Sequence, residues 1–314
     1  MTDKPAVLVI GHLPQRDLDA MARRFTVLEY FSAADKPAFL AKHGASVRFV
    51  STRGETGINA EQLAALPNLE IVACYAVGTD MVDLAACRAR KIPVTNTAGV
   101  LTDEVADMAL ALLLSAFRQI PAGDAWVRGG DWAAKGSMAL QRRMYGKRLG
   151  IVGLGAIGRA VAKRAEGFAM PIAYSGRSKQ DIPYAYYPDP LAMAPHVDAL
   201  VVCAAGGPAT RNLVSAAVIA ALPKGAILVN VARGTVVEEA AVIAALRSGQ
   251  LGAAGLDVFL NEPAIDPVFA GFPNVVLQPH AASATYETRG AMGDLMLANM
   301  EAWLDGRPLL TPVA

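Results

Sequence analysis

Short apolar runs alternate with longer amphipathic stretches along most of the chain. The first run, Ala6–Ile10, has five consecutive apolar residues, as expected for a strand that is buried on both faces of a parallel sheet. Runs of the same kind predict further strands at 25–30, 46–50, 70–74 and 92–95, with helices between them at 59–66 and 82–91. Such alternation is typical of a parallel sheet with helices on both faces.

A long helix and a second alternating module follow. The helix is predicted to begin at Thr102, a candidate N-cap with two acidic residues after it, and to end near Ile120, before Pro121. A polar, glycine-rich stretch at 122–147 interrupts the pattern. The second module has predicted strands at 148–152, 171–175, 199–203, 226–231, 253–258 and 275–277, and helices at 156–167, 215–222 and 238–248. A last helix, at about 285–304, follows this module.

Composition narrows the class of protein. The chain has 314 residues, enough for two domains, and 54% of them are apolar. The longest strongly apolar run, Met108–Phe117, falls short of the roughly 20 residues that span a membrane. A net charge of +1 argues against nucleic-acid or membrane-surface partners. The three cysteines are widely spaced, which fits neither a disulfide framework nor a metal site. With no signal-peptide pattern at the N-terminus, we expect a cytoplasmic protein.

A glycine motif follows the first strand of the second module. Residues Gly153 to Gly158 read Gly-Leu-Gly-Ala-Ile-Gly and lie between a predicted strand and a predicted helix, which is the context of a dinucleotide-binding loop. Gly153 would permit the tight turn, Gly155 the approach of the backbone to a pyrophosphate, and Gly158 the packing of helix on strand. The amides near Ala156 and Ile157 would face the phosphates. The alternative is a glycine-rich turn without a ligand.

The next strand bears on the choice of nucleotide. An NAD site usually has an acidic residue about 20 positions after the glycines, but residues 174–179 read Tyr-Ser-Gly-Arg-Ser-Lys, with no acid before Asp181. A guanidinium can bind a 2′-phosphate through two hydrogen bonds. We therefore expect NADP(H) to be preferred, with Arg177 and Ser178 on the phosphate and NAD(H) as the second choice. A solvated basic loop is the alternative.

Three chemically complementary residues follow successive strands of the second module. Arg233 follows one predicted strand, Glu262 follows the next, and His280 follows the last. An arginine can bind a carboxylate with two hydrogen bonds, and a glutamate can hold an imidazole in one tautomer and favour its protonated form. Singly, each residue is more often part of a turn or a surface loop. Together, beside a dinucleotide loop, they predict hydride transfer with His280 as proton donor.

These motifs resemble the D-isomer-specific 2-hydroxyacid dehydrogenases over essentially the whole chain. The resemblance is carried by Gly153–Gly158, Val229–Gly234, Gly255–Pro263 and Pro279–Ser283. Within the family, the chain is similar to the NADPH-dependent glyoxylate/hydroxypyruvate reductases and the hydroxyphenylpyruvate reductases. Segment 204–208 departs from the Pro-Leu-Thr-like segment of many relatives. The segments that match these two groups of reductases more closely are 77–80, 94–97, 100–107, 176–178 and 308–312.

The resemblance implies a reaction and a set of roles. A small 2-oxo acid of the glyoxylate, hydroxypyruvate or hydroxyphenylpyruvate type would be reduced to the D-2-hydroxy acid. Arg233 would bind the carboxylate and carbonyl of the substrate, His280 would donate the proton with Glu262 as its partner, and Val77 and Gly78 would offer backbone amides. The cofactor-binding residues would be Leu154, Gly155, Ala156, Ile157, Ser175, Arg177, Ser178, Cys203, Val231, Ala232, Asp257 and Thr102, the last two near the nicotinamide.

The expected fold is α/β, with two Rossmann-like, doubly wound parallel-sheet domains and a cleft between them. Residues 1–97 and 285–314 would form a discontinuous substrate-binding domain, and residues 98–284 the dinucleotide-binding domain. The resemblance implies a homodimer through the cofactor domain, with Trp132 reaching the partner or packing as a simple anchor. Two alternatives remain: an NAD-linked dehydrogenase of phosphoglycerate, formate or phosphite, and a non-enzymatic dinucleotide-sensing corepressor. His12, His43 and His196 have no assigned role.

Overall fold

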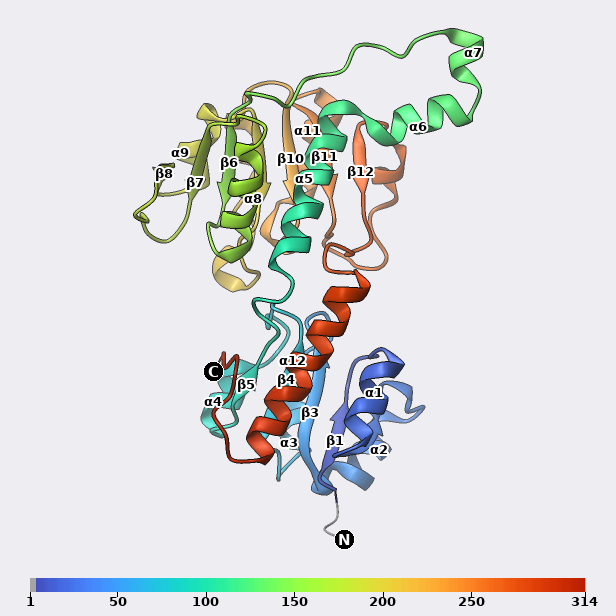
Figure 1. Cartoon of the computed structure of the whole chain (residues 1–314), viewed down its shortest axis with the longest axis vertical. Helices are drawn as coiled ribbons and strands as arrows, with labels where there is room; N and C mark the ends of the chain where they lie inside the picture. Colours follow the sequence, from blue (N-terminus) through green and yellow to red (C-terminus); the bar gives the residue numbers. More distant parts are fainter. Residues whose placement is uncertain (1–3, 314) are drawn as a thin grey trace. The chain divides into compact units, whose positions relative to one another are not determined.

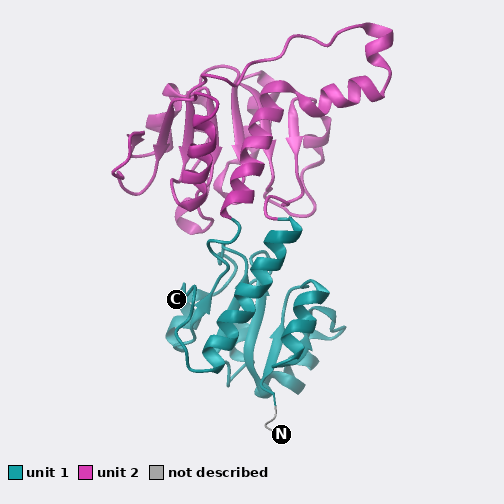
Figure 2. Cartoon of the chain, viewed as in Figure 1, with its two compact units in different colours: residues 1–101, 284–314 teal, residues 102–283 magenta. Residues whose placement is uncertain are grey.

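Two parallel sheets, of five and seven strands, organise the chain (Figure 1). The computed structural model describes residues 4–313; residues 1–3 and 314, which belong to the expected substrate-binding domain, lie outside the described part. The chain divides into two compact units, residues 1–101 with 284–314 and residues 102–283 (Figure 2). An α/β fold with two all-parallel sheets is therefore confirmed.

Unit 1 contains the five-stranded sheet, in the order β2-β1-β3-β4-β5. Its strands are β1 (Ala6–Val9), β2 (Thr26–Glu29), β3 (Val47–Arg53), β4 (Ile71–Tyr75) and β5 (Val94–Thr95). Its helices are α1 (Gln15–Ala22), α2 (Lys36–His43), α3 (Ala60–Ala64), α4 (Leu84–Ala89) and α12 (Tyr286–Leu304). The last helix of the chain, α12, packs on α1 and β4, so it completes the unit in which the chain begins.

Unit 2 contains the seven-stranded sheet, in the order β12-β11-β10-β9-β6-β7-β8. Its strands are β6 (Leu149–Val152), β7 (Ile172–Ser175), β8 (Ala185–Tyr187), β9 (Ala199–Val202), β10 (Ala226–Asn230), β11 (Leu251–Leu256) and β12 (Val275–Leu277). From β6 the chain runs outward to β8 and then returns to β9 on the other side of β6. The strand order therefore reverses between β6 and β9, and ligands bind at such a reversal in open α/β sheets.

Helices cover both faces of this sheet. On one face, α5 (Thr102–Arg118) packs against α8 (Ala156–Glu166) and lies across β10 and β11. On the other face, a buried apolar core joins the strands to α9 (Pro190–Met193), α10 (Ala216–Ala221) and α11 (Glu239–Ser248). Strands β6, β9 and β10 are buried at every position, which explains their uninterrupted apolar sequences.

The stretch after α5 differs from the sequence-based expectation. Helix α5 ends at Arg118 and Gln119 is left-handed (φ 50°), but Pro121 does not stop helix formation: it lies in the first turn of α6 (Ile120–Arg128). Proline is tolerated there because the first-turn amides have no partner within the helix. A further short helix, α7 (Asp131–Lys135), follows. Thr102 is itself the first helical residue rather than the residue before it.

No single helix among residues 4–313 is both long and apolar enough to cross a bilayer, and only α5 and α6 taken together, bent by 61°, meet that test. Eight residues of α5 are buried within the protein, as is usual for a core helix.

Candidate active site

The glycine loop connects β6 to α8 at the reversal of strand order. Gly153 has φ 91°, and a Cβ atom there would lie 2.7 Å from Ala204 Cα, just beyond β9. A Cβ on Gly158 would lie 2.3 Å from the carbonyl oxygen of Gly153. Any side chain at either position would push the turn apart. At Gly155, by contrast, no atom lies within 4 Å of the Cβ position, so a pyrophosphate could approach the backbone. The loop fits a dinucleotide.

The other expected cofactor residues lie at or just after the carboxyl ends of neighbouring strands, apart from Thr102 at the start of α5. Ser175 is buried at the end of β7, and Arg177 and Ser178 are exposed beyond it. The amide of Cys203, after β9, donates to the carbonyl of Val152 at 2.9 Å. Leu154, Val231, Ala232 and Asp257 are buried, Ile157 is half-buried, and Ala156 is exposed.

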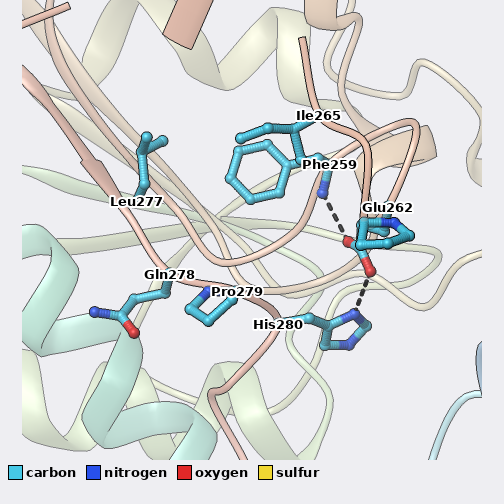
Figure 3. A pocket seen from close by; sticks show the side chains of 8 residues that line it. Phe259, Glu262, Ile265, Leu277, Gln278, Pro279 and His280 are labelled. Atoms are coloured by element: carbon cyan, nitrogen blue, oxygen red, sulfur yellow. Dashed lines mark hydrogen bonds and ion pairs between the residues drawn. The ribbon is translucent and has the colours of Figure 1, made fainter. Parts of the chain in front are cut away.

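His280 and Glu262 form a close polar side-chain pair at this edge of the sheet. The imidazole Nδ1 lies 2.6 Å from Glu262 Oε2 (Figure 3). An ionised carboxylate only accepts hydrogen bonds, so Nδ1 carries the hydrogen and Nε2 remains for another partner. The His280 side chain is 35% exposed, which leaves the ring accessible from solvent. The pair therefore has the arrangement of a general acid with a carboxylate that orients it.

Glu262 is held in its ionised form. Burial alone would raise the pKa of its carboxyl, but the hydrogen bond with His280 and the one from the Phe259 amide lower it. The charges of His280 and Arg233 lower the pKa of Glu262 further, and the net shift is downward. The Phe259 amide donates to Glu262 Oε1 at 2.8 Å. Both carboxylate oxygens are thus engaged.

The backbone around His280 is unusual. His280 is left-handed, with φ 52°, a conformation that costs a non-glycine residue about 1–3 kcal/mol. Its amide donates to the carbonyl of Asp257 at 2.8 Å. The Asp257 carboxylate accepts from the amides of Ala281 at 2.7 Å and Ala282 at 3.1 Å. Burial raises the pKa of Asp257, and these two amide bonds oppose the rise.

Arg233 follows β10 in a turn shaped by a buried amide side chain. Asn230 is 2% exposed; its Nδ2 donates to the carbonyl of Arg233 at 3.0 Å and its Oδ1 accepts from the Ala232 amide at 3.0 Å. The Arg233 guanidinium donates to the Ala232 carbonyl at 2.8 Å. Asn230 and the Phe259 amide were not expected from the sequence, because their roles depend on turns whose shape the residue pattern does not specify.

A largely apolar pocket of about 280 Å³ adjoins the His280–Glu262 pair. Figure 3 shows the Phe259, Ile265 and Leu277 side chains around it. These apolar neighbours remove water from one side of Glu262, which accounts for the burial that opposes its ionisation.

Val77 and Gly78 belong to unit 1 and follow β4. Asn96 Nδ2 donates to the Val77 carbonyl at 3.0 Å, and Cys74 Sγ donates to the Gly78 carbonyl at 3.6 Å. The turn is therefore held through its carbonyl groups. Within residues 4–313, the amides of Val77 and Gly78 donate no hydrogen bond.

The remaining histidines lie against aromatic rings. His12 is 5.2 Å from Phe31, His43 is 4.7 Å from Phe39, and His196 is stacked on Tyr187 at 5.4 Å, measured between ring centroids. No group of His, Cys, Asp and Glu is placed to hold a metal ion in the part of the chain that the structure describes.

A glycine loop at the strand reversal and a carboxylate-bound histidine on the same sheet edge define a dinucleotide-dependent oxidoreductase. Comparison with known proteins identifies the family. Residues 110–282 match the family profile described as D-isomer specific 2-hydroxyacid dehydrogenase, NAD binding domain. The chain belongs to the D-isomer-specific 2-hydroxyacid dehydrogenases, as the resemblance predicted.

Individual relatives cover nearly the whole chain. The glyoxylate/hydroxypyruvate reductase A of Arabidopsis thaliana is 43% identical over 93% of this chain and 94% of its own. The hydroxyphenylpyruvate reductase of Plectranthus scutellarioides is 45% identical over 95% of each. The solved structure of the NADPH-dependent glyoxylate/hydroxypyruvate reductase of Sinorhizobium meliloti, in complex with NADP and malonate, is 39% identical, with a TM-score of 0.93 over 99% of this chain and 97% of that one.

Proposed function

We propose that this protein reduces a small 2-oxo acid of the glyoxylate, hydroxypyruvate or hydroxyphenylpyruvate type to the D-2-hydroxy acid, with NADPH preferred over NADH. The observation that carries the proposal is the 2.6 Å contact between His280 Nδ1 and Glu262 Oε2. When bound, the reduced dinucleotide supplies the hydride. The activities of the relatives described above support the substrate class.

His280 is the proposed proton donor. Reduction of the carbonyl carbon leaves negative charge on its oxygen, and a protonated imidazole can donate to that oxygen through Nε2. Glu262 accepts from Nδ1, and the ionised state favoured by its lowered pKa stabilises the imidazolium. Asp257 contributes indirectly, because its carboxylate fixes the backbone turn that begins at His280.

The substrate carboxylate is assigned to Arg233 and to the Val77–Gly78 turn. A guanidinium offers two parallel donors that match the two carboxylate oxygens. Arg233 lies near enough to Glu262 for its charge to lower the pKa of that group, so it belongs to the same electrostatic site as His280. Within residues 4–313 the amides of Val77 and Gly78 donate no hydrogen bond, so they could donate to an anion.

The nucleotide preference rests on exposed positive charge beyond β7. Arg177, Ser178 and Lys179 are exposed and carry cationic or hydroxyl donors suited to a 2′-phosphate. The cofactor residues expected from the sequence (Leu154, Gly155, Ala156, Ile157, Ser175, Cys203, Val231, Ala232, Asp257 and Thr102) keep their assigned role as part of this proposal.

We further propose a homodimer and a cytoplasmic location. Helices α6 and α7 and the loop after them expose large apolar side chains: Ile120 (48%), Val127 (55%), Trp132 (61%) and Leu140 (102%). Such exposure is typical of a surface that a partner covers, and a second copy is the partner implied by the family. Sedimentation of the full chain tests the dimer, and a monomer would contradict it.

The proposed cytoplasmic location is supported by the three free cysteines, which suit a reducing compartment.

One experiment tests the activity. Glyoxylate, hydroxypyruvate and hydroxyphenylpyruvate are each assayed with NADPH and with NADH, by following nicotinamide absorbance. We expect turnover of at least one acid and a kcat/KM for NADPH more than about tenfold above that for NADH, equivalent to about 1.4 kcal/mol. No turnover of any acid would contradict the substrate class. A preference for NADH would contradict the nucleotide assignment alone.

A further inference from the structure

The exposed segment Arg177–Lys179 is held between two fixed points of unit 2. On one side, the phenol hydroxyl of Tyr186 donates to the carbonyl of Gly176 at 3.3 Å. On the other side lies Gln180, which is half-buried and bonded through both its backbone and its side chain. The segment therefore has anchored ends although its own three side chains are exposed.

Gln180 connects this segment to the glycine loop. Its backbone amide donates to the phenol oxygen of Tyr174 at 2.7 Å, and that tyrosine is completely buried in β7. Its side-chain Nε2 donates to the carbonyl of Leu154, inside the glycine loop, at 3.0 Å. Its Oε1 accepts from Arg159, in the first turns of α8, at 2.7 Å from Nη2 and 3.1 Å from Nε. Gln180 thus joins three elements around the expected nucleotide, β7 through its backbone amide and the glycine loop and α8 through its side chain.

A glutamine suits this position better than a charged residue of the same size. A carboxamide both donates and accepts, so Gln180 can bind Leu154 and Arg159 at once. A glutamate could bind Arg159 but could not donate to Leu154, and it would add negative charge where a phosphate is expected. Among residues 4–313, Arg159 binds the Gln180 side chain and forms no ion pair with an acidic group, so its positive charge at the start of α8 is uncompensated.

We propose that Gln180 is a positioning residue for nucleotide selectivity: it fixes the Arg177–Lys179 segment against the glycine loop so that the segment can bind the 2′-phosphate of the dinucleotide. The inference rests on the proposed NADPH preference. Gln180 acts through Arg177 rather than by touching the phosphate itself. Its contribution should therefore vanish when Arg177 is absent.

A double-mutant cycle on the full chain tests this mechanism. The dissociation constants of NADP⁺ and NAD⁺ are measured by isothermal titration calorimetry for wild type, Gln180→Ala, Arg177→Ala and the double variant. For Gln180→Ala we expect NADP⁺ binding to weaken by about three- to tenfold, as for the loss of one or two hydrogen bonds, with NAD⁺ binding nearly unchanged. In the Arg177→Ala background, removing Gln180 should change NADP⁺ binding by less than about twofold.

Two results would overturn the inference. Equal weakening of NADP⁺ and NAD⁺ would show that Gln180 merely supports the glycine loop. An undiminished effect of Gln180→Ala without Arg177 would show that the two residues act separately. If wild type binds NAD⁺ as tightly as NADP⁺, the proposed nucleotide preference fails, and the inference fails with it; that result is read from the wild-type titrations alone.

Gln250→Ala is the matched control. Gln250 Nε2 donates to the carbonyl of Leu222 at 2.7 Å and to that of Ile219 at 3.2 Å, so this variant also loses amide-to-carbonyl bonds in unit 2. The ratio of NADP⁺ to NAD⁺ affinity should stay at the wild-type value. Gln180→Glu supplies a second variant: it keeps an acceptor for Arg159, and we expect it to lower the ratio at least as far as Gln180→Ala. A ratio unchanged by Gln180→Glu would contradict the proposal.

Discussion

Asp257 binds the backbone of His280 and of the two residues that follow it. Its carbonyl accepts from the His280 amide at 2.8 Å, and its carboxylate accepts from the amides of Ala281 and Ala282. These three bonds hold His280 in a left-handed conformation. The position of the imidazole that we propose as the proton donor is thus fixed through the main chain by a buried acid.

Asp257→Asn should weaken both the fold and the reaction. The amide side chain keeps one acceptor oxygen but turns a donor toward the second backbone amide, which then loses its partner. We expect the free energy of unfolding to fall by about 1–3 kcal/mol, and kcat to fall because the turn at His280 is held less firmly. Denaturant unfolding and steady-state kinetics measure the two effects. Asp305→Asn, at an exposed ion pair with Arg24, is the control, and a kcat equal to that of the control would contradict the role.

His280→Ala should remove the proton donor and leave nucleotide binding intact. A positioned general acid contributes about 10²- to 10⁴-fold to rate, so kcat should fall within that range. The dissociation constant of NADPH, measured by fluorescence titration, should stay near the wild-type value. His196→Ala removes a histidine that stacks on Tyr187 and should leave kcat unchanged. Unchanged turnover in His280→Ala would exclude His280 as the acid.

Arg233→Ala should impair the use of the 2-oxo acid. Hydrogen bonds to charged groups contribute about 1.5–3 kcal/mol, so we expect kcat/KM for the acid to fall by about 10- to 100-fold, with KM raised. Arg233→Lys keeps the charge but not the paired donors, and should recover only part of the loss. Substrate-saturation curves give both constants. If KM and kcat of Arg233→Ala match wild type, Arg233 does not bind the substrate.

Glu262→Gln should alter how stability depends on pH. The folded state lowers the pKa of Glu262 below its ordinary value of 4.5. Its ionised form therefore stabilises the fold above pH 4.5, and this stabilisation is lost as the pH falls through the lower, folded-state pKa. The difference in unfolding free energy between wild type and Glu262→Gln should be largest near neutral pH and shrink in acid. A difference that is constant across this range would contradict the shift.

The strands of both sheets could be predicted where burial makes every residue apolar. Each expected strand overlaps an observed one, and Val275–Leu277 has the same bounds in both. Strand β8 is not predicted because its sequence, Ala-Tyr-Tyr, lacks the aliphatic run of Val-Val-Leu that indicates the equally short edge strand β12. Helix α6 is not predicted because a proline that follows a helical pattern indicates its end, whereas a proline in a first turn is equally compatible with the start of a helix.

The residue types of the site could be predicted from the sequence, but their geometry could not. Sequence order placed Arg233, Glu262 and His280 after successive strands, and the contact between the last two follows from parallel strands ending at one edge. The left-handed turn at His280 and the amide bonds of Asp257 depend on loop conformations that many sequences could adopt. Gln180 belongs to no sequence motif. Its proposed role follows from the hydrogen bond of its side chain to the carbonyl of Leu154, 26 residues earlier in the chain.

The order of strands in unit 2 places the residues proposed for proton transfer and substrate binding apart from the segment proposed to select the coenzyme. Arg233, Glu262 and His280 follow β10, β11 and β12, whereas the Arg177–Lys179 segment, which we propose binds the 2′-phosphate, follows β7, on the far side of β6. That segment joins the last two strands at the free edge of the sheet, where a connection can change in length or charge without shifting the strands that support the reactive groups. On the proposed assignments, coenzyme preference could therefore be exchanged by evolution or by engineering while the proton-donating pair of His280 and Glu262 stays as it is.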